Sequence, residues 1–455
     1  MARPSVREST ACRHYGAHGL PGCLPFIPVR CALTGAPDCY SDELATVNPF
    51  QAYRFSPAAG DPSQLLTQPY DKISPEMQAR YLAADPHNIV RIILGERRAS
   101  DTDSDNVYTR GAKYFQDWIR EGILAQDHQP GFYAYTQDFP VPGSNQHLTR
   151  HSFIGLGKVE DYAMGVVFRH EHTMPAPKKD RLQVLRHCRA HFGQIFMLYA
   201  DPENEVDREL TAAAQGAPIV DVTDEYGARH RLWAIADLAR VERIQELMAP
   251  RKLLIADGHH RYETALNYQR EHPDDPAARH VMMTFVNLHS PGLKILATHR
   301  VLRHLPSFRV EDMLAKATGA WSARRFDSLR ELKHELSQPT PQSVRIGVVT
   351  AAENWLLARP RAGGELDVPI LHGEIMREWL GIGEQAVREE QHIQYVRGME
   401  AAAAEVREKG AQLALLLEPT PMDDMARIAF SGGVMPPKST DFYPKLLTGI
   451  AIYRL

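Results

Sequence analysis

Side chains capable of phosphate chemistry are concentrated in one short stretch of the sequence. In order, this stretch contains Asp257, Gly258, His259, His260 and Arg261. An apolar run typical of a buried strand precedes it and helix-periodic residues follow, so we expect a strand–turn–helix junction. A helix N-terminus offers unpaired N–H groups and the positive end of the helix dipole, both of which favour an anion. The stretch therefore predicts a phosphate-binding turn.

The side chains of this turn are open to more than one interpretation. His260 would stabilise a transferring phosphoryl group or its leaving oxygen, and Arg261 would clamp a phosphate. A carboxylate beside phosphates needs an intervening cation, and Mg²⁺ usually binds one or two carboxylates together with phosphate oxygens. Asp257 is therefore a candidate magnesium ligand. The alternative is structural, with Asp257 as the N-cap of the helix and the cationic residues solvated.

A second group of candidates lies upstream, between residues 170 and 181. On a strand end, His170 and His172 would face one side and Glu171 the other, and the prolines after them predict an extended loop. Glu171 would be the general base that activates a hydroxyl. The basic residues that follow would either attract a polyphosphate or form an ordinary solvated helix start. They are Lys178, Lys179 and Arg181.

Two weaker candidates lie nearer the end of the sequence. Lys438, Ser439 and Thr440 combine a cation with hydroxyls, which suits an anion, but the glycine-rich segment of a P-loop does not precede them. His299 and Arg300 follow a predicted strand. They either join the site from the edge of the sheet or are satisfied within the core.

Apolar periodicity indicates the elements that must position these residues. Strands are predicted over residues 88–94, 131–139, 149–159, 194–199, 228–234, 253–256, 280–288 and 293–298, with another inside 161–169. Helices are predicted over residues 74–83, 104–121 and 179–191, from residue 242, and directly after Gly258. Beyond residue 305, the segments 310–318, 344–350, 370–379 and 399–409 alternate helix and strand. We therefore expect a mixed-sheet catalytic core over residues 45–305 and a C-terminal α/β portion over 306–455 that completes the site.

Composition narrows the functional class. The chain has 455 residues with a net charge of −4, from 52 basic and 56 acidic residues, which argues against a protein devoted to nucleic acid. No apolar run approaches the roughly 18 residues of a membrane span, so we expect a soluble protein. We expect the body of the chain to be cytoplasmic. Four of the five cysteines lie in the first 39 residues, without the Cys-x-x-Cys spacing of common zinc sites. We interpret residues 1–44 as a poorly ordered extension.

The sequence resembles an uncharacterised family, domain of unknown function 1015, from about residue 45 onward. The resemblance rests on several rare strings in the right order. They are Pro69-Tyr70-Asp71-Lys72-Ile73-Ser74, His170-Glu171-His172-Thr173, Lys178-Lys179-Asp180-Arg181-Leu182, Ala256-Asp257-Gly258-His259-His260-Arg261-Tyr262, Ala297-Thr298-His299-Arg300, Met435-Pro436-Pro437-Lys438-Ser439-Thr440 and Phe442-Tyr443-Pro444-Lys445. We also predict substrate-binding roles for Tyr70, Asp71, His170, His172, His299 and Arg300.

A more distant resemblance carries chemistry. The Asp-Gly-His-His-Arg turn is similar to that of free-serine kinases, which share a fold with the ParB and sulfiredoxin nucleotide-binding domains. This resemblance implies an α/β (α+β) fold whose mixed-sheet core contains a phosphate-binding strand–turn–helix. It also implies that Gly258, His259 and Arg261 cradle phosphates, and that Glu171 corresponds to the kinases' proposed base.

Three functional hypotheses follow. The leading one is a phosphotransferase that moves phosphate, with Mg²⁺, from ATP, ADP or pyrophosphate to a small hydroxyl substrate such as free serine. The second is a metal-dependent hydrolase, whose ligands would be His170, His172, Asp257, His259 and His260. The third is a nucleotide-binding scaffold without turnover. The sequence does not predict the oligomeric state.

Overall fold

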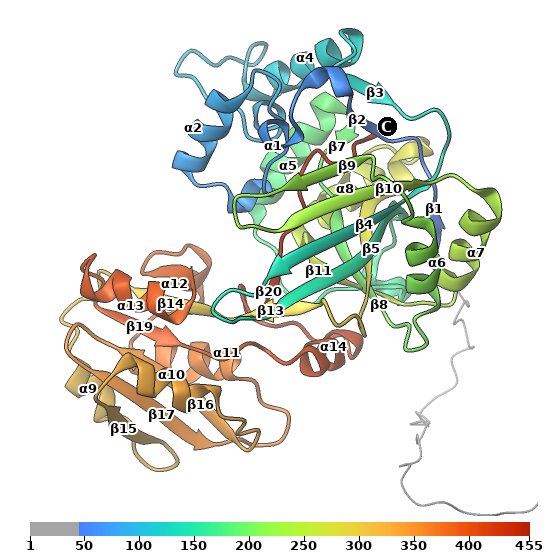
Figure 1. Cartoon of the computed structure of the whole chain (residues 1–455). Helices are drawn as coiled ribbons and strands as arrows, with labels where there is room; N and C mark the ends of the chain where they lie inside the picture. Colours follow the sequence, from blue (N-terminus) through green and yellow to red (C-terminus); the bar gives the residue numbers. More distant parts are fainter. Residues whose placement is uncertain (1–44) are drawn as a thin grey trace, which may run out of the picture. The chain divides into compact units, whose positions relative to one another are not determined.

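A nine-stranded mixed sheet is the largest sheet in the part of the chain that the structure describes (Figure 1). The computed structural model describes residues 45–455, so the predicted cysteine-rich extension lies outside it. The strand order is β6-β11-β8-β12-β5-β4-β10-β9, with β1 paired to β5. The β11–β6 and β12–β8 pairs are parallel and the others antiparallel. The strands are β1 (Val47–Asn48), β4 (Phe132–Pro140), β5 (His147–Lys158), β6 (Val167–Phe168), β8 (Ile195–Tyr199), β9 (Val220–Thr223), β10 (Arg229–Ile235), β11 (Leu253–Asp257) and β12 (His280–Asn287).

Both faces of this sheet are covered. Successive side chains of β11 point to opposite faces, so Leu253 and Ile255 belong to one core cluster and Leu254 and Ala256 to another. Three helices cover the first face: α6 (Glu205–Ala213), α7 (Leu238–Met248) and α8 (His259–Glu271). Residues from 425 to 451 pack on the second face. Burial on both sides explains why β11 is a continuous apolar run.

Short elements surround the large sheet and support the site. The helices are α1 (Pro62–Leu65), α2 (Pro75–Ala84), α3 (Val90–Ile93), α4 (Val107–Arg120) and α5 (Pro175–Cys188). The two-stranded pairs are β2 (Tyr53–Phe55) with β3 (Leu124–Gln126), β7 (Ala190–His191) with β21 (Tyr453–Arg454), and β13 (Lys294–Leu296) with β20 (Asp441–Tyr443). Single 3-10 turns are formed by Pro57–Ala59, Tyr70–Lys72, Tyr162–Met164 and Ala277–Arg279.

A second sheet has six antiparallel strands in the order β15-β17-β16-β19-β14-β18. Its strands are β14 (Thr298–Leu302), β15 (Ser322–Phe326), β16 (Ser343–Val349), β17 (Asn354–Pro360), β18 (Ile393–Arg397) and β19 (Leu413–Leu416). The helices here are α9 (Val310–Leu314), α10 (Leu329–Ser337), α11 (Asp367–Ile370), the π-helical segment Leu371–Trp379, α12 (Glu384–Arg388) and α13 (Met399–Arg407). Helix α14 (Met422–Phe430) follows the second sheet in the sequence but packs on the first.

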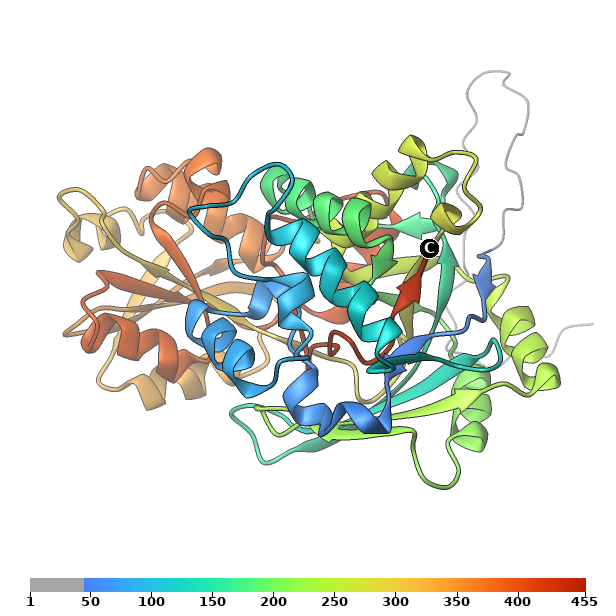
Figure 2. The same cartoon turned by 90° about the horizontal axis from the view of Figure 1, so that it is seen from above.

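The chain returns from the second sheet to the first. Strand β20 pairs with β13, Met435 bridges Glu171, and Ile452 bridges Tyr53, so the end of the chain lies beside the β2 segment (Figure 2). The second sheet already includes β14, which precedes residue 305, and residues 442–451 pack against the first sheet. The division of the chain after residue 305 stays a prediction.

The predicted mixed α/β architecture is confirmed, and so are the main strands and the helix at 104–121. The prediction of a strand over residues 88–94 is wrong. These residues include the short helix α3, which starts where the Asn88 side chain accepts a hydrogen bond from the Val90 amide (2.9 Å). Val90, Ile92 and Ile93 are all buried. A short, mainly apolar run carries no period that separates helix from strand.

The extended loop predicted after His172 is also wrong. Pro175 and Pro177 lie in the first turn of α5, where a fixed φ and a missing N–H are compatible with a helix. Within 161–169 the strand is restricted to Val167–Phe168, after a 3-10 turn at Tyr162–Met164. Between residues 45 and 455, none of the helices combines the length and apolar character needed to cross a membrane.

Candidate functional site

The predicted strand–turn–helix is present at the end of β11. Gly258 has φ +92°, a left-handed conformation that strongly favours glycine, and it is the N-cap of α8. The first helical hydrogen bond runs from the Tyr262 amide to the Gly258 carbonyl (3.0 Å). The amides of the three residues between them therefore lie in the first turn, where helix N–H groups have no intrahelical acceptor. Asp257 is not the N-cap, which excludes that alternative.

A cleft lies in front of this turn. It encloses about 580 Å³ of empty space, part of it open to solvent. Four permanent cations line it, from three distant parts of the sequence, together with three carboxyl groups, three histidines, a tyrosine and a threonine. These residues are Lys72, Arg261, Lys438, Lys445, Asp71, Glu171, Asp257, His172, His259, His260, Tyr70 and Thr440. The cleft thus combines the predicted turn with the predicted Glu171 and Lys438–Thr440 segments.

An ion network centred on Lys445 forms the floor of the cleft. The Lys445 ammonium lies 2.7 Å from an Asp257 oxygen and 3.0 Å from an Asp441 oxygen. Burial alone would raise the pKa of the Asp257 carboxyl, but Lys445, Arg261 and Lys72 hold it well below its ordinary value. Lys445 itself lowers the pKa of the Lys72 ammonium, and burial adds to this effect. The cleft therefore favours binding of a further anion, because an anion there would reduce the repulsion between Lys445 and Lys72.

The sequence analysis missed Lys72, Lys445 and Asp441 as site residues. Lys72 and Lys445 stand inside strings already identified with the family, at Pro69–Ser74 and Phe442–Lys445. That position was the only signal that could have selected them. Nothing in the spacing of the chain indicates that residue 445 meets residue 257.

The donors around Asp257 bear on its predicted contact with Mg²⁺. One carboxylate oxygen accepts from the Gly258 amide (2.7 Å) and the other from Lys445 (2.7 Å). Over residues 45–455, no three His, Cys, Asp or Glu side chains gather as a group that could hold a metal ion. The lysine ammonium thus fills the place expected for a cation beside Asp257. We accordingly assign no chemical step to a metal held by this carboxylate.

Glu171 also lines the cleft. Its carboxylate accepts a hydrogen bond from the Lys438 amide (3.2 Å). Burial raises the pKa of Glu171, and the charge of Lys438 opposes this rise only in part. A carboxylate with a raised pKa is a stronger base than a solvated one, which suits proton abstraction from a hydroxyl.

Hydrogen bonds fix the protonation of two histidines at the site. The Met174 amide donates to His260 Nε2 (2.8 Å), and burial lowers the His260 pKa, so the ring proton is on Nδ1. His170 bonds the Ile255 carbonyl through Nδ1 (2.8 Å) and Thr440 through Nε2 (2.8 Å). Since the carbonyl can only accept, His170 carries its proton on Nδ1, and Thr440 is the donor to Nε2.

His170 and His172 do not share a face as the strand interpretation predicted. His170 is fully buried behind the cleft, whereas His172 is exposed at its rim. Only Glu171 of this segment forms a β-bridge, to Met435, so strand alternation does not set these side chains. His259 is buried too, and its ring centroid lies 4.7 Å from that of His170.

The remaining predicted basic residues differ in their positions. Lys178 forms an ion pair with Glu263 (2.8 Å), and Lys179 is exposed. Arg181 stacks on the Tyr70 ring, 4.0 Å from its centroid. None of these three lines the cleft itself.

The other predicted residues lie behind the cleft wall. The Ser439 hydroxyl is buried and donates to the Pro436 carbonyl (2.7 Å). Arg300 is also buried and donates to the Lys438 carbonyl (3.1 Å), which makes it a positioning residue for the Lys438 segment. His299 accepts from the Leu417 amide (3.3 Å) inside the second sheet, as the core alternative predicted.

Buried histidines predict how stability depends on pH. Burial lowers the pKa of His170, His191 and His299 from 6.5 to about 4. Between these values the unfolded chain binds protons that the folded chain does not, so each histidine removes about 1.4 kcal/mol of stability per pH unit as the pH falls. Burial raises the pKa of Asp207 to about 6, so its carboxyl binds a proton in the folded chain before it does in the unfolded chain. This offsets the destabilising effect of one histidine. The free energy of unfolding measured with urea should be clearly lower at pH 4.5 than at pH 6.5. Equal free energies at the two pH values would contradict this prediction.

Comparison with solved structures finds remote similarity. A conserved hypothetical protein from Pyrococcus furiosus aligns with a TM-score of 0.32 at 10% identity, over 61% of this chain and 87% of that one. A free serine kinase variant in complex with ADP gives 0.35 at 10% identity, over 61% and 84%. SbnI with a C-terminal truncation, from Staphylococcus aureus, gives 0.32 at 10% identity, over 65% and 85%.

Comparison with sequence-family models identifies the family, which the remote structural similarities do not. No curated protein is significantly similar to this chain. The model of the family described as "Protein of unknown function (DUF1015)" matches residues 47–375, which carry most of the cleft. The chain belongs to the DUF1015 family.

Proposed function

We propose that the protein is a cytoplasmic phosphotransferase that moves a phosphoryl group from a nucleotide or pyrophosphate to the hydroxyl of a small substrate, with free serine as the first candidate. One observation carries the proposal. A single cleft brings together a helix N-terminus with a glycine cap, four permanent cations and the Glu171 carboxyl, whose pKa burial raises. Phosphoryl transfer depends mainly on positioning and charge stabilisation, which these groups supply.

The proposed step assigns each group a task. Glu171 accepts the proton of the substrate hydroxyl as its oxygen attacks the terminal phosphorus. The bond from that phosphorus to the leaving oxygen breaks, and the leaving oxygen keeps the electron pair. Arg261 and Lys438 neutralise the phosphate oxygens, and His260 offers its Nδ1–H to the charge that develops. A Mg²⁺ ion would arrive on the phosphates of the donor, where it would neutralise their charge.

A direct assay tests the reaction class. The full-length protein is incubated with Mg²⁺, free serine and, in parallel, ATP, ADP or pyrophosphate, and products are followed by ³¹P NMR. Formation of phosphoserine with one donor is the expected result. Absence of any new phosphoester, with serine and with a panel of small hydroxyl compounds, would overturn the proposal. Nucleotide binding without turnover would then support the scaffold hypothesis.

Arg261→Ala is expected to weaken donor binding about 10- to 100-fold, because a charge-assisted hydrogen bond contributes about 1.5–3 kcal/mol. Arg261 is well positioned for this role. A Cβ at Gly258 or Gly193 would lie only 3.1 or 3.2 Å from its guanidinium, so both glycines leave room for it. Titration calorimetry with ADP measures the change. Lys179→Ala, which removes an exposed cation, is the matched control, and equal affinities in the two variants would contradict the role of Arg261.

A further inference from the structure

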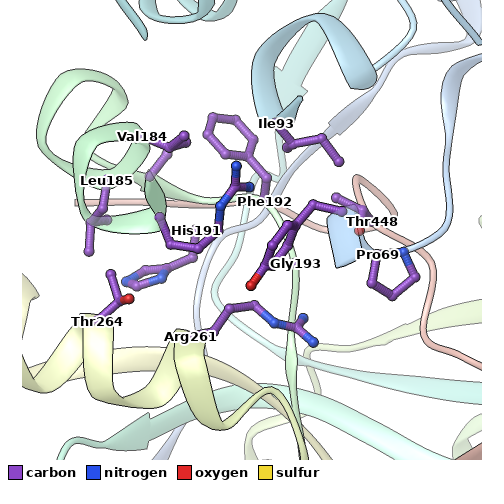
Figure 3. A pocket seen from close by; sticks show the side chains of 13 residues that line it. Pro69, Ile93, Val184, Leu185, His191, Phe192, Gly193, Arg261, Thr264 and Thr448 are labelled. Carbon is purple, nitrogen blue, oxygen red and sulfur yellow. The ribbon is translucent and has the colours of Figure 1, made fainter. Parts of the chain in front are cut away.

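A second cavity, drawn in Figure 3, shares two lining residues with the cleft. We call it the side cavity, and it encloses about 560 Å³ of empty space, part of it open to solvent. Tyr70 and Arg261 line both spaces, so these two side chains form the wall between them. In Figure 3 the Arg261 side chain extends from α8 along the edge of the side cavity. No function considered so far uses this space.

The chemistry of the side cavity differs from that of the cleft. Its apolar walls come from Ile93 of α3, Val184 and Leu185 of α5, and Phe192. All four are at least nine-tenths buried. Such walls do not attract a phosphate, but they suit a flat, weakly polar ring.

Polar groups stand at the edges of these walls. His191 lines the side cavity, and burial alone lowers its pKa to about 4, so its ring is neutral and offers one donor and one acceptor. The Thr448 side chain also lines the side cavity. Arg181 reaches the same space and lies over the Tyr70 ring, 4.0 Å from its centroid. Apolar walls with a few polar groups at the edge match a heteroaromatic base, which has apolar faces and hydrogen-bonding edges.

We infer that the side cavity binds the base of a nucleoside di- or triphosphate whose phosphates lie in the cleft. This inference rests on the proposed function, and it selects a nucleotide over pyrophosphate as the donor. The wall shared by the two spaces supports this inference. A ligand that extends past Tyr70 and Arg261 would place an apolar end in the side cavity and an anionic end in the cleft. Pyrophosphate has no apolar part, and free serine is too polar to gain from these walls.

The test compares diphosphates with and without a base. Titration calorimetry measures the affinity of the full-length protein for ADP and for inorganic pyrophosphate at the same Mg²⁺ concentration. The wild type should bind ADP at least about tenfold more tightly, a difference of about 1.4 kcal/mol. Val184→Trp fills the side cavity and should remove the preference for ADP while pyrophosphate affinity stays unchanged. Lys179→Trp places the same ring on the exposed side of α5 and should keep the preference.

Each outcome decides between the two proposals. If the wild type binds pyrophosphate as tightly as ADP, the side cavity holds no base, although the phosphate site stands. A folded Val184→Trp variant that keeps the ADP preference overturns the inference as well. If the wild type binds neither ligand, the proposed function itself fails. Should Val184→Trp fail to fold, the ratio measured on the wild type still decides the question.

Discussion

Glu171→Gln is expected to lower turnover about 10²- to 10⁴-fold, the usual contribution of a general base, while donor affinity stays within about twofold. Glutamine keeps the size of the side chain and can still accept from the Lys438 amide, but it cannot take a proton from the substrate hydroxyl. Single-turnover assays would separate the chemical step from binding. Glu96→Gln, in an exposed loop, is the matched control and should behave as the wild type.

The pH profile gives this prediction a second readout. Glu171 must be ionised to act as a base, and burial raises its pKa. The wild-type rate should therefore rise with pH through the raised pKa of this carboxyl and then level off. The residual activity of Glu171→Gln should lack that acidic limb. An unchanged limb in the variant, or wild-type turnover, would show that another group takes the proton.

Lys445→Met is expected to destabilise the protein by about 3–5 kcal/mol at pH 7.5, because it removes one partner of a buried ion network. The Lys445 side chain is 8% exposed, and its ammonium bridges Asp257 and Asp441. Without it, Asp441 keeps Arg397, at 2.6 Å, and Asp257 loses its direct ion-pair partner. Urea unfolding measures the loss. Lys409→Met, which removes an exposed partner of Glu405, should have little effect.

The pH dependence of this destabilisation distinguishes the loss of the ion pair in Lys445→Met from the loss of side-chain packing. In the wild type, nearby cations hold the pKa of Asp257 and of Asp441 low even though burial acts to raise both. In Lys445→Met only Arg261 and Lys72 still oppose the effect of burial, so the pKa of Asp257 should rise from its wild-type value and the folded variant should bind a proton at a higher pH than the wild type does. The deficit relative to the wild type should therefore shrink between pH 7.5 and pH 4. An equal deficit at both pH values would point to lost packing instead.

The local part of the site could be predicted from the sequence because local physics determines it. The run from Leu253 to Ala256 is apolar, Gly258 permits a left-handed turn, and helical spacing resumes at once, so the junction follows from neighbouring residues. The short helix α3 could not be predicted in the same way. Three of its four residues are buried and apolar, and so short a run satisfies strand and helix patterns equally well.

The long-range part of the site depends on packing that no local pattern encodes. The Glu171 carboxylate meets the amide of a residue 267 positions away, and Lys445 meets Asp257 across 188 positions. Charge patterns in the sequence also do not indicate which partner a basic side chain meets. Lys178 forms an ion pair with Glu263, and Arg300 donates to a backbone carbonyl. The family strings indicated which segments matter, and the fold decides which of their side chains face the cleft.

The return of the chain from the second sheet to the first determines when the cleft can exist during biosynthesis. Lys438, Thr440 and Lys445 all follow β19, so a ribosome releases both sheets before it releases half of the basic lining. Contacts of such long sequence separation close slowly, because loop-closure entropy must be overcome first. We therefore expect nascent chains to acquire phosphate affinity only after residue 445 has emerged. Until then Asp257 lacks its lysine counter-charge.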